Sequence, residues 1–106
     1  FGLIDRGHQP HLIVFSPGNF EGLGAVRREE MNECCKRLTM DSSNCFILEG
    51  NQFVDDPQSL WKKENVSRIV EDYLRQWQID LLITFDQQGI SGHLNHRSLF
   101  YGLQFF

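Results

Sequence analysis

The chain has 106 residues, enough for one small domain, and 41% of them are hydrophobic, which supports a folded core and argues against disorder. Fourteen acidic against ten basic residues give a formal net charge of −4, without an extended Lys/Arg cluster. This balance argues against nucleic-acid binding and favours a small molecule or another protein as partner. No apolar run approaches the roughly 20 residues that cross a bilayer.

The first half of the chain predicts a helix end, a strand, a helix and a second strand. The apolar residues 1–4 are interpreted as the end of a helix whose beginning is missing, and residues 11–15 as a strand. Residues 25–38 have helical periodicity, and residues 45–48 form the second predicted strand. The apolar stripe of the predicted helix comprises Met31, Cys34, Cys35 and Leu38.

The second half predicts a helix, a strand and a final helix. Residues 63–78 are helical in pattern, and residues 96–106 form the last predicted helix. The apolar face of the first of these helices comprises Val66, Ile69, Val70, Tyr73, Leu74 and Trp77. Residues 79–85 are nearly all apolar, which is typical of a central parallel strand covered on both faces.

This alternation of strands and helices predicts an α/β fold with a mostly parallel sheet. Ligands of such sheets bind at the carboxyl ends of the strands. Three polar loops, residues 16–24, 49–60 and 86–95, follow the predicted strands. The chemistry is therefore expected in these loops.

The three cysteines do not suggest a disulfide framework. Cys34 and Cys35 are adjacent in a predicted helix, so their side chains diverge, and Cys45 makes the count odd. This usage predicts no disulfide framework and a reducing compartment.

The third loop contains two imidazoles, His93 and His96, just before a predicted helix. Side chains at this spacing can point into one cleft, and zinc favours nitrogen ligands. Alternatively, Asn95 is only a helix N-cap and both histidines are solvated. The spacing alone leaves both interpretations open.

The first two loops each combine polar groups that suit a substrate. Three glycines precede the helix that carries Arg27, which suggests an anion site, although the spacing is not that of a P-loop. The alternative is a surface arginine paired with Glu21 or Glu30. In the second loop, Asp55 and its neighbour Asp56 could accept hydrogen bonds from sugar hydroxyls, or form only a polar turn.

Together the three loops resemble one protein family. The segments FSPGNFEGLGAVRREEM (residues 15–31), FVDDPQSLW (53–61) and TFDQQGISGHLNH (84–96) are similar to signatures of the N-acetylglucosaminyl-phosphatidylinositol de-N-acetylases. This family lies within the wider LmbE-like zinc deacetylases, and the resemblance covers essentially the whole chain. The third segment is the most specific, because bacterial relatives tend to have Asp where Asn95 stands.

The resemblance implies catalytic roles in the third loop. His96 matches a zinc ligand, and His93 matches a histidine that stabilises the tetrahedral oxyanion or protonates the leaving amine. Asn95 stands where an acidic residue often orients this histidine, and Asp86 is implied to orient His93 or the loop.

The resemblance also implies substrate-binding residues. Arg27 matches an arginine that faces the inositol-phosphate side of the substrate, and Asp55 matches a carboxylate near the sugar hydroxyls. Gly18 and Asn19, in the first segment, are expected to bind substrate beside Arg27.

The implied fold is Rossmann-like, with three layers and a mostly parallel sheet. Members of the family begin with a strand that ends in Ala-His-Pro-Asp-Asp-Glu, which supplies two further zinc ligands and the general base. This motif does not occur here. We therefore expect residues 1–106 to be a single partial domain without the N-terminal strand, with an incomplete zinc site and no activity by itself.

The implied reaction is zinc-dependent hydrolysis of the acetamide of N-acetylglucosaminyl-phosphatidylinositol, in glycosylphosphatidylinositol-anchor synthesis at the cytoplasmic face of the endoplasmic reticulum. Membrane contact is expected only through this glycolipid substrate or through missing segments. One alternative is a deacetylase of another N-acetylated glycoconjugate, and a second is a non-catalytic binding or scaffold variant. The sequence makes no prediction of oligomeric state.

Overall fold

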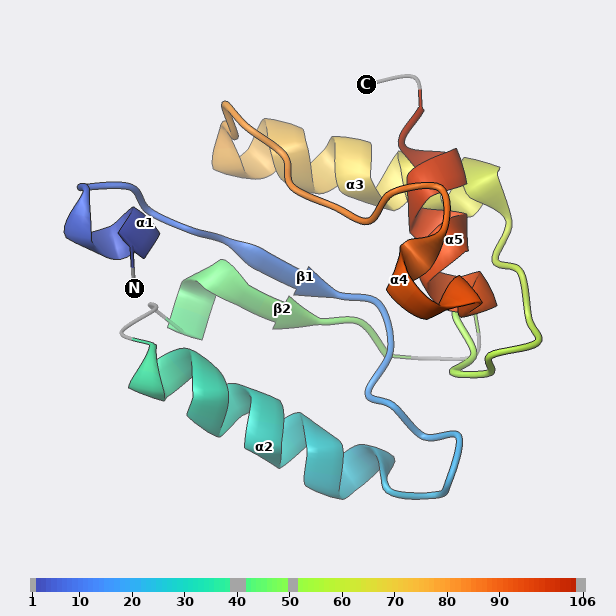
Figure 1. Cartoon of the computed structure of the whole chain (residues 1–106). Coiled ribbons are helices and arrows are strands. Elements are labelled where there is room, and N and C mark those ends of the chain that lie inside the picture. The colour runs from blue at the N-terminus through green and yellow to red at the C-terminus, as the bar shows by residue number, and fades with distance from the viewer. Residues whose placement is uncertain (1, 39–41, 50–51, 105–106) are drawn as a thin grey trace. The chain divides into compact units, whose positions relative to one another are not determined.

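The computed structural model describes residues 2–38, 42–49 and 52–104. The chain forms two compact units, Phe1–Asp55 and Asp56–Phe106, and each is described by itself (Figure 1). The expectation of a single partial domain stays a prediction.

The first unit is a parallel strand pair with a helical crossover. Its elements are α1 (Gly2–Asp5), β1 (Leu12–Val14), α2 (Gly24–Arg37), the 3-10 helix η1 (Ser42–Asn44) and β2 (Cys45–Ile47). The strands pair in parallel and α2 connects them, as parallel pairing requires of a crossover (Figure 1). The predicted strands, the helix between them and their parallel pairing are confirmed.

The helix α2 faces β2 through Cys35 rather than Cys34. Cys35 is buried and Cys34 is exposed, because neighbouring helical residues point about 100° apart. The prediction that Cys34 lies on the apolar stripe is therefore wrong, whereas Met31 and Leu38 are half-buried.

The predicted absence of a disulfide is also wrong. Cys35 is bonded to Cys45, with the two Cα atoms 6.8 Å apart. The sequence did not indicate this pair because only the packing of α2 against β2 brings the helix residue to the first residue of the strand. Cysteine usage consequently no longer supports a reducing compartment.

Two aromatic residues close the core of the first unit. Phe15, directly after β1, and Phe53, in the loop after β2, are both buried. Their rings meet edge to face with centroids 5.0 Å apart, a preferred aromatic geometry. This contact joins the two loops at the carboxyl ends of the strands.

The second unit is helical. It contains α3 (Lys63–Trp77), α4 (Gly89–Gly92) and α5 (Leu94–Gly102). The predicted apolar face of α3 is confirmed, with Val66 and Val70 fully buried and its other four residues half-buried. α5 packs on α3 so closely that a Cβ atom at Gly102 would lie 2.5 Å from Cγ1 of Val66.

The predicted strand over residues 79–85 is wrong, because this segment is irregular. Leu81 and Ile83 are 75% and 73% exposed. A strand requires a hydrogen-bonded neighbour, and the described part of the second unit contains no other strand. An apolar composition alone therefore does not predict that a segment pairs as a strand.

The last helix starts at Leu94, two residues earlier than predicted, and residues 105–106 of that prediction lie outside the described residues. The observed fold is a mixed α/β structure with a small, two-stranded parallel sheet. Within the described ranges, no helix has the length and apolar character needed to cross a membrane.

Candidate functional site

The structure brings His93 and His96 together. Their rings stack with centroids 4.6 Å apart and planes 19° from parallel. The Phe85 ring also stacks on His96, with ring centroids 4.2 Å apart and planes 3° from parallel. Both imidazoles are half-buried rather than freely solvated. The two imidazoles are thus in contact, and their shared site and individual roles stay predictions.

The hydrogen bond of His96 determines which nitrogen carries the proton in its neutral ring. Nδ1 lies 3.2 Å from the carbonyl oxygen of Gly89. Since a carbonyl can only accept, Nδ1 is assigned as the donor, which leaves a lone pair on Nε2. A neutral imidazole in this tautomer can bind a metal ion through Nε2.

His93 has the opposite tautomer. Its Nδ1 accepts a hydrogen bond of 3.2 Å from the backbone N–H of Asn95. The proton of the neutral His93 ring is therefore assigned to Nε2, where it can be donated. The stacked pair combines one ring that can bind a metal ion with one that can donate a proton.

A tight turn positions the Gly89 carbonyl. Oδ1 of Asp86 accepts hydrogen bonds of 2.9 Å from the backbone N–H groups of Gln88 and Gly89. Gly89 has φ of +61°, and a Cβ atom there would lie 2.8 Å from Cβ of His96. Of the two roles implied for Asp86, these bonds correspond to ordering the loop.

Ile90 follows in a strained conformation. Its φ of 71° and ψ of −62° are rare for a β-branched residue, and its side chain is 84% exposed. Such strain often occurs at functional sites. The sequence contains no signal for this feature.

Asn95 is buried, and its side chain contacts the loop before α3. Oδ1 accepts a hydrogen bond of 3.0 Å from Asp56 N–H, and Nδ2 donates one of 2.7 Å to Ser59 O. The N-cap of α5 is His93, so the interpretation of Asn95 as the N-cap is wrong. Only the backbone of Asn95 bonds to His93; its catalytic role stays a prediction.

In the first unit, two of the predicted substrate-binding residues lie at the turn after β1. Gly18 has φ of +78°, and the Cδ atom of Arg27 lies 2.9 Å from where its Cβ would be. Within the described residues, the structure shows no ion pair between Arg27 and Glu21 or Glu30. Nη1 of Arg27 lies 3.5 Å from where a Cβ atom of Gly18 would be, so the guanidinium lies against the glycine turn.

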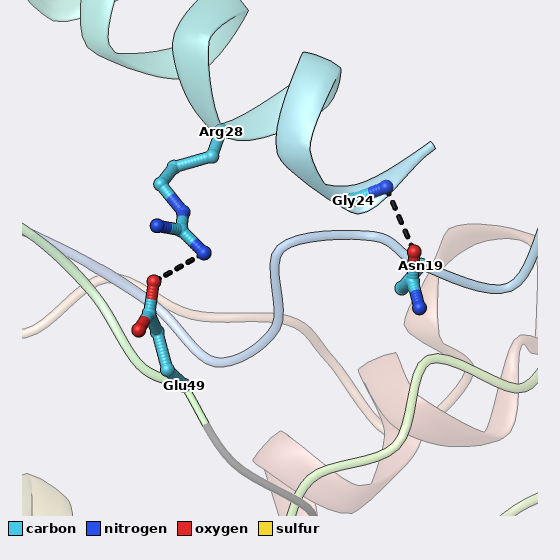
Figure 2. Close-up of polar contacts among 4 residues, drawn as sticks. All are labelled: Asn19, Gly24, Arg28 and Glu49. Atoms are coloured by element: carbon cyan, nitrogen blue, oxygen red, sulfur yellow. Dashed lines mark hydrogen bonds and ion pairs between the residues drawn. The ribbon is translucent and has the colours of Figure 1, made fainter. Parts of the chain in front are cut away.

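The other two bind the backbone of the same loop. Oδ1 of Asn19 accepts a hydrogen bond of 2.9 Å from Gly24 N–H, at the start of α2 (Figure 2). Oδ2 of Asp55 accepts one of 3.1 Å from Phe20 N–H, so the loop after β2 is tied to the loop after β1. Arg28, which the sequence did not single out, forms an ion pair with Glu49 (Figure 2).

A comparison with protein families assigns the lineage. Residues 2–104 match the family described as PIG-L, GlcNAc-PI de-N-acetylase. The chain belongs to this family. The match confirms the resemblance indicated by the three loop segments and extends over nearly all of the chain.

Individual relatives agree with this family. The chain is 36% identical over 98 residues to the N-acetylglucosaminyl-phosphatidylinositol de-N-acetylase of Bos taurus. This aligned region covers 92% of this chain and 39% of the relative. A protein of the same name from Arthroderma benhamiae is 34% identical over 98% of this chain and 36% of its own length. The Saccharomyces cerevisiae protein of that name is 28% identical, and the match covers 85% of this chain and 30% of that protein.

The chain thus spans less than two fifths of the length of these relatives, at 39%, 36% and 30%. No solved structure matches the chain.

The zinc ion implied by the resemblance does not fit the described residues alone. Within residues 2–38, 42–49 and 52–104, no group of three or more His, Cys, Asp or Glu side chains could hold a metal ion. A catalytic zinc site takes three protein ligands. His93 and His96 supply at most two, so a complete zinc centre needs donors that these residues do not provide.

Sequence reasoning missed residues that shape this site through packing. Ser98 is buried and bonds to Trp61 N–H, and Phe85 stacks on His96. The spacing of Ser98, three residues after Asn95, places both on one helix face and was the available signal. The stacking of Phe85 had no signal, because residues 79–85 were expected to form a strand.

Proposed function

We propose that the protein containing this chain hydrolyses the acetamide of N-acetylglucosaminyl-phosphatidylinositol, in glycosylphosphatidylinositol-anchor synthesis. The family match supports the reaction class, and the stacked His93–His96 pair is the observation that carries the proposal. The complete domain is proposed to be a three-layer, Rossmann-like fold. Its proposed location is the cytoplasmic face of the endoplasmic reticulum.

His93 suits the proton-donating role in amide hydrolysis. Attack of water on the acetamide carbonyl creates an oxyanion, and cleavage requires a proton on the leaving amine. The assigned tautomer of His93 leaves Nε2–H free to donate a hydrogen bond to that oxyanion. Delivery of a proton to the amine would require a ring protonated at both nitrogens, a form in which Nδ1 no longer accepts from Asn95 N–H, so the tautomer in this structure favours the oxyanion role.

His96 is proposed as one ligand of a zinc ion, because its Nδ1–H is held by the Gly89 carbonyl and Nε2 retains a lone pair. A bound zinc ion would polarise the amide carbonyl and lower the pKa of its water. Because the described residues fall short of three ligands, we expect the chain as given to bind zinc weakly and to be inactive. Inductively coupled plasma mass spectrometry of the purified chain tests this, and a stoichiometric, tightly held ion would contradict it.

The loops after β1 and β2 are proposed to bind the substrate. Arg27 is a cation next to the backbone turn at Gly18, which suits the phosphate of the inositol side. Asp55, already an acceptor for Phe20 N–H, has a second carboxylate oxygen for a sugar hydroxyl. Asn19 shapes the turn by its bond to Gly24.

The decisive experiment is a deacetylation assay of the full-length protein. N-acetylglucosaminyl-phosphatidylinositol and a water-soluble N-acetylated glycoconjugate are compared as substrates, with wild type, His96→Ala and the control Gln104→Ala. Gln104 is exposed and lies after α5. We expect turnover of the glycolipid, its loss in His96→Ala and its retention in Gln104→Ala.

Two other results would replace the proposal. Turnover of only the soluble glycoconjugate would indicate a deacetylase of different specificity. Absence of turnover in a folded full-length protein would favour a non-catalytic binding variant, which the lack of a three-ligand group in the described residues also allows.

A further inference from the structure

We propose that Asn95 and Ser98 form a clamp that holds the loop of residues 56–61 against the start of α5, and that both are positioning residues for His93. The hydrogen-bond pattern stands by itself. Its effect on turnover rests on the proposed function.

Asn95 makes the first half of the clamp. Its side chain is 2% exposed and uses both ends of the amide: Oδ1 accepts from Asp56 N–H at 3.0 Å, and Nδ2 donates to Ser59 O at 2.7 Å. A carboxylate could replace only the acceptor, and an alkyl side chain neither. The site therefore specifies asparagine.

Ser98 makes the second half, one helical turn further on. It is 1% exposed, and its Oγ accepts from Trp61 N–H at 2.8 Å while donating to Leu94 O at 2.7 Å. A backbone bond of 3.2 Å joins Leu94 N–H to the carbonyl oxygen of Pro57, which lies in sequence between the two loop residues that Asn95 binds. The loop that leads into α3 is thus bound to α5 by four hydrogen bonds, at Asp56, Pro57, Ser59 and Trp61.

The clamp reaches the histidine pair through the backbone of Asn95. The same residue that binds the loop donates its N–H to Nδ1 of His93, the bond that assigns the His93 tautomer. Burying an amide without its hydrogen-bond partners is unfavourable, so the side-chain bonds hold this residue in place. Displacing Asn95 would therefore displace both the loop and the His93 ring.

This arrangement gives the asparagine a different role from direct contact with His93. The side-chain atoms of Asn95 are occupied by Asp56 and Ser59, so the amide acts on the loop. An Asn95→Asp variant should weaken the loop by setting a carboxylate against the Ser59 carbonyl, while keeping the bond from Asp56 N–H.

Hydrogen exchange of the full-length protein, followed by mass spectrometry with residue-level fragmentation, tests the clamp. Asn95→Ala should accelerate exchange of the Asp56 amide about tenfold or more, and Ser98→Ala that of the Trp61 amide. Asn95→Asp should leave the Asp56 amide slow. Gln104→Ala, the exposed control, should change neither, and the Val70 amide inside α3 reports whether the fold is intact.

Kinetics of the same variants test positioning. With the glycolipid substrate, Ser98→Ala should mainly raise KM, and Asn95→Ala should also lower kcat about tenfold, because Asn95, unlike Ser98, bonds to the His93 ring. A purely structural role would reduce the amount of active enzyme without changing KM.

The outcomes of these experiments distinguish failure of the clamp from failure of the proposed function. Unchanged exchange of Asp56 in Asn95→Ala, or of Trp61 in Ser98→Ala, with Val70 still protected, would overturn the clamp. If Asn95→Ala does not fold, rapid exchange of Asp56 in Asn95→Asp would overturn it instead. If the exchange pattern holds but the wild-type protein has no turnover, the proposed function fails and the clamp stands.

Discussion

Nδ1 of His96 lies 3.2 Å from the carbonyl oxygen of Gly89, and a Cβ atom at position 89 would lie 2.8 Å from Cβ of the same histidine. The glycine thus orients the imidazole and leaves room for it. Asp86 fixes the turn through its bond to Gly89 N–H. The orientation of the proposed metal ligand therefore depends on a loop seven residues earlier in the chain.

Gly89→Ala should displace His96. Gly89 and Gly92 both have positive φ, +61° and +80°, but a Cβ at Gly92 would meet nothing within 4 Å. Both alanine variants should lose about 1 kcal/mol of stability from backbone strain, and Gly89→Ala about 1–3 kcal/mol more from overpacking. Urea unfolding measures the stabilities, and nitrogen-15 NMR of the imidazoles measures the His96 tautomer. Equal losses in both variants, with an unchanged His96 spectrum, would refute the close-approach argument.

Ile90→Gly should stabilise the protein. The φ of 71° costs a β-branched residue about 1–3 kcal/mol, whereas the exposed side chain contributes little packing. After the greater unfolded-state entropy of glycine is subtracted, a net gain of about 1 kcal/mol is expected. Ile90→Ala, which keeps the Cβ and hence the strain, is the control. A midpoint of urea unfolding that is no higher in Ile90→Gly than in Ile90→Ala would exclude strain at this position.

Gly102→Ala should separate α5 from α3. The new methyl group would lie 2.5 Å from Cγ1 of Val66, a fully buried residue. We expect a loss of about 1–3 kcal/mol in the free energy of unfolding from overpacking. Val66→Ala in the same chain removes Cγ1 but keeps Cβ, which would lie 2.6 Å from the new methyl group. The double variant should therefore recover part of the overpacking loss and be more stable than the sum of the single losses predicts. Strict additivity in the double-mutant cycle would show that the two residues do not compete for this space.

Reduction of the Cys35–Cys45 disulfide should destabilise the first unit. The bond closes a loop with a sequence separation of 10. On the loop-entropy estimate, Cys45→Ser should cost about 2–3 kcal/mol. Cys34→Ser, which changes the exposed free cysteine, should cost little. Thiol titration of the unreduced, unfolded chain should find one free thiol, and finding three would contradict the pairing.

The two tyrosines should ionise in separate steps. The hydrogen bond from Arg97, helped by Gln87, lowers the pKa of Tyr101, whereas burial raises the pKa of Tyr73. As pH rises toward the ordinary tyrosine pKa, Tyr101 ionises first in the folded protein, which stabilises the folded state. Above that pKa, Tyr73 ionises more readily in the unfolded chain, which destabilises the folded state. Absorbance at the phenolate band should show an early step that Tyr101→Phe removes and a late step that Tyr73→Phe removes. A single step in the wild-type protein would contradict both shifts.

Local patterns in the sequence predicted most elements. Residues 11–15, 25–38, 45–48 and 63–78 were assigned within one or two residues of β1, α2, β2 and α3, because hydrophobic periodicity follows backbone geometry. The strand predicted over residues 79–85 was wrong because strand formation depends on more than local periodicity. A strand is defined by its neighbour, and apolar composition alone cannot supply one.

The sequence by itself determined the family of this chain, since the motifs around Arg27, Asp55 and His93 are linear features that need no folding to be read. Only the tertiary structure decided what each side chain touches. It joined Cys35 to Cys45, stacked Phe85 on His96 and directed the amide of Asn95 to the loop of residues 56–61. These contacts join residues distant in sequence, and their directions depend on how helices and loops pack.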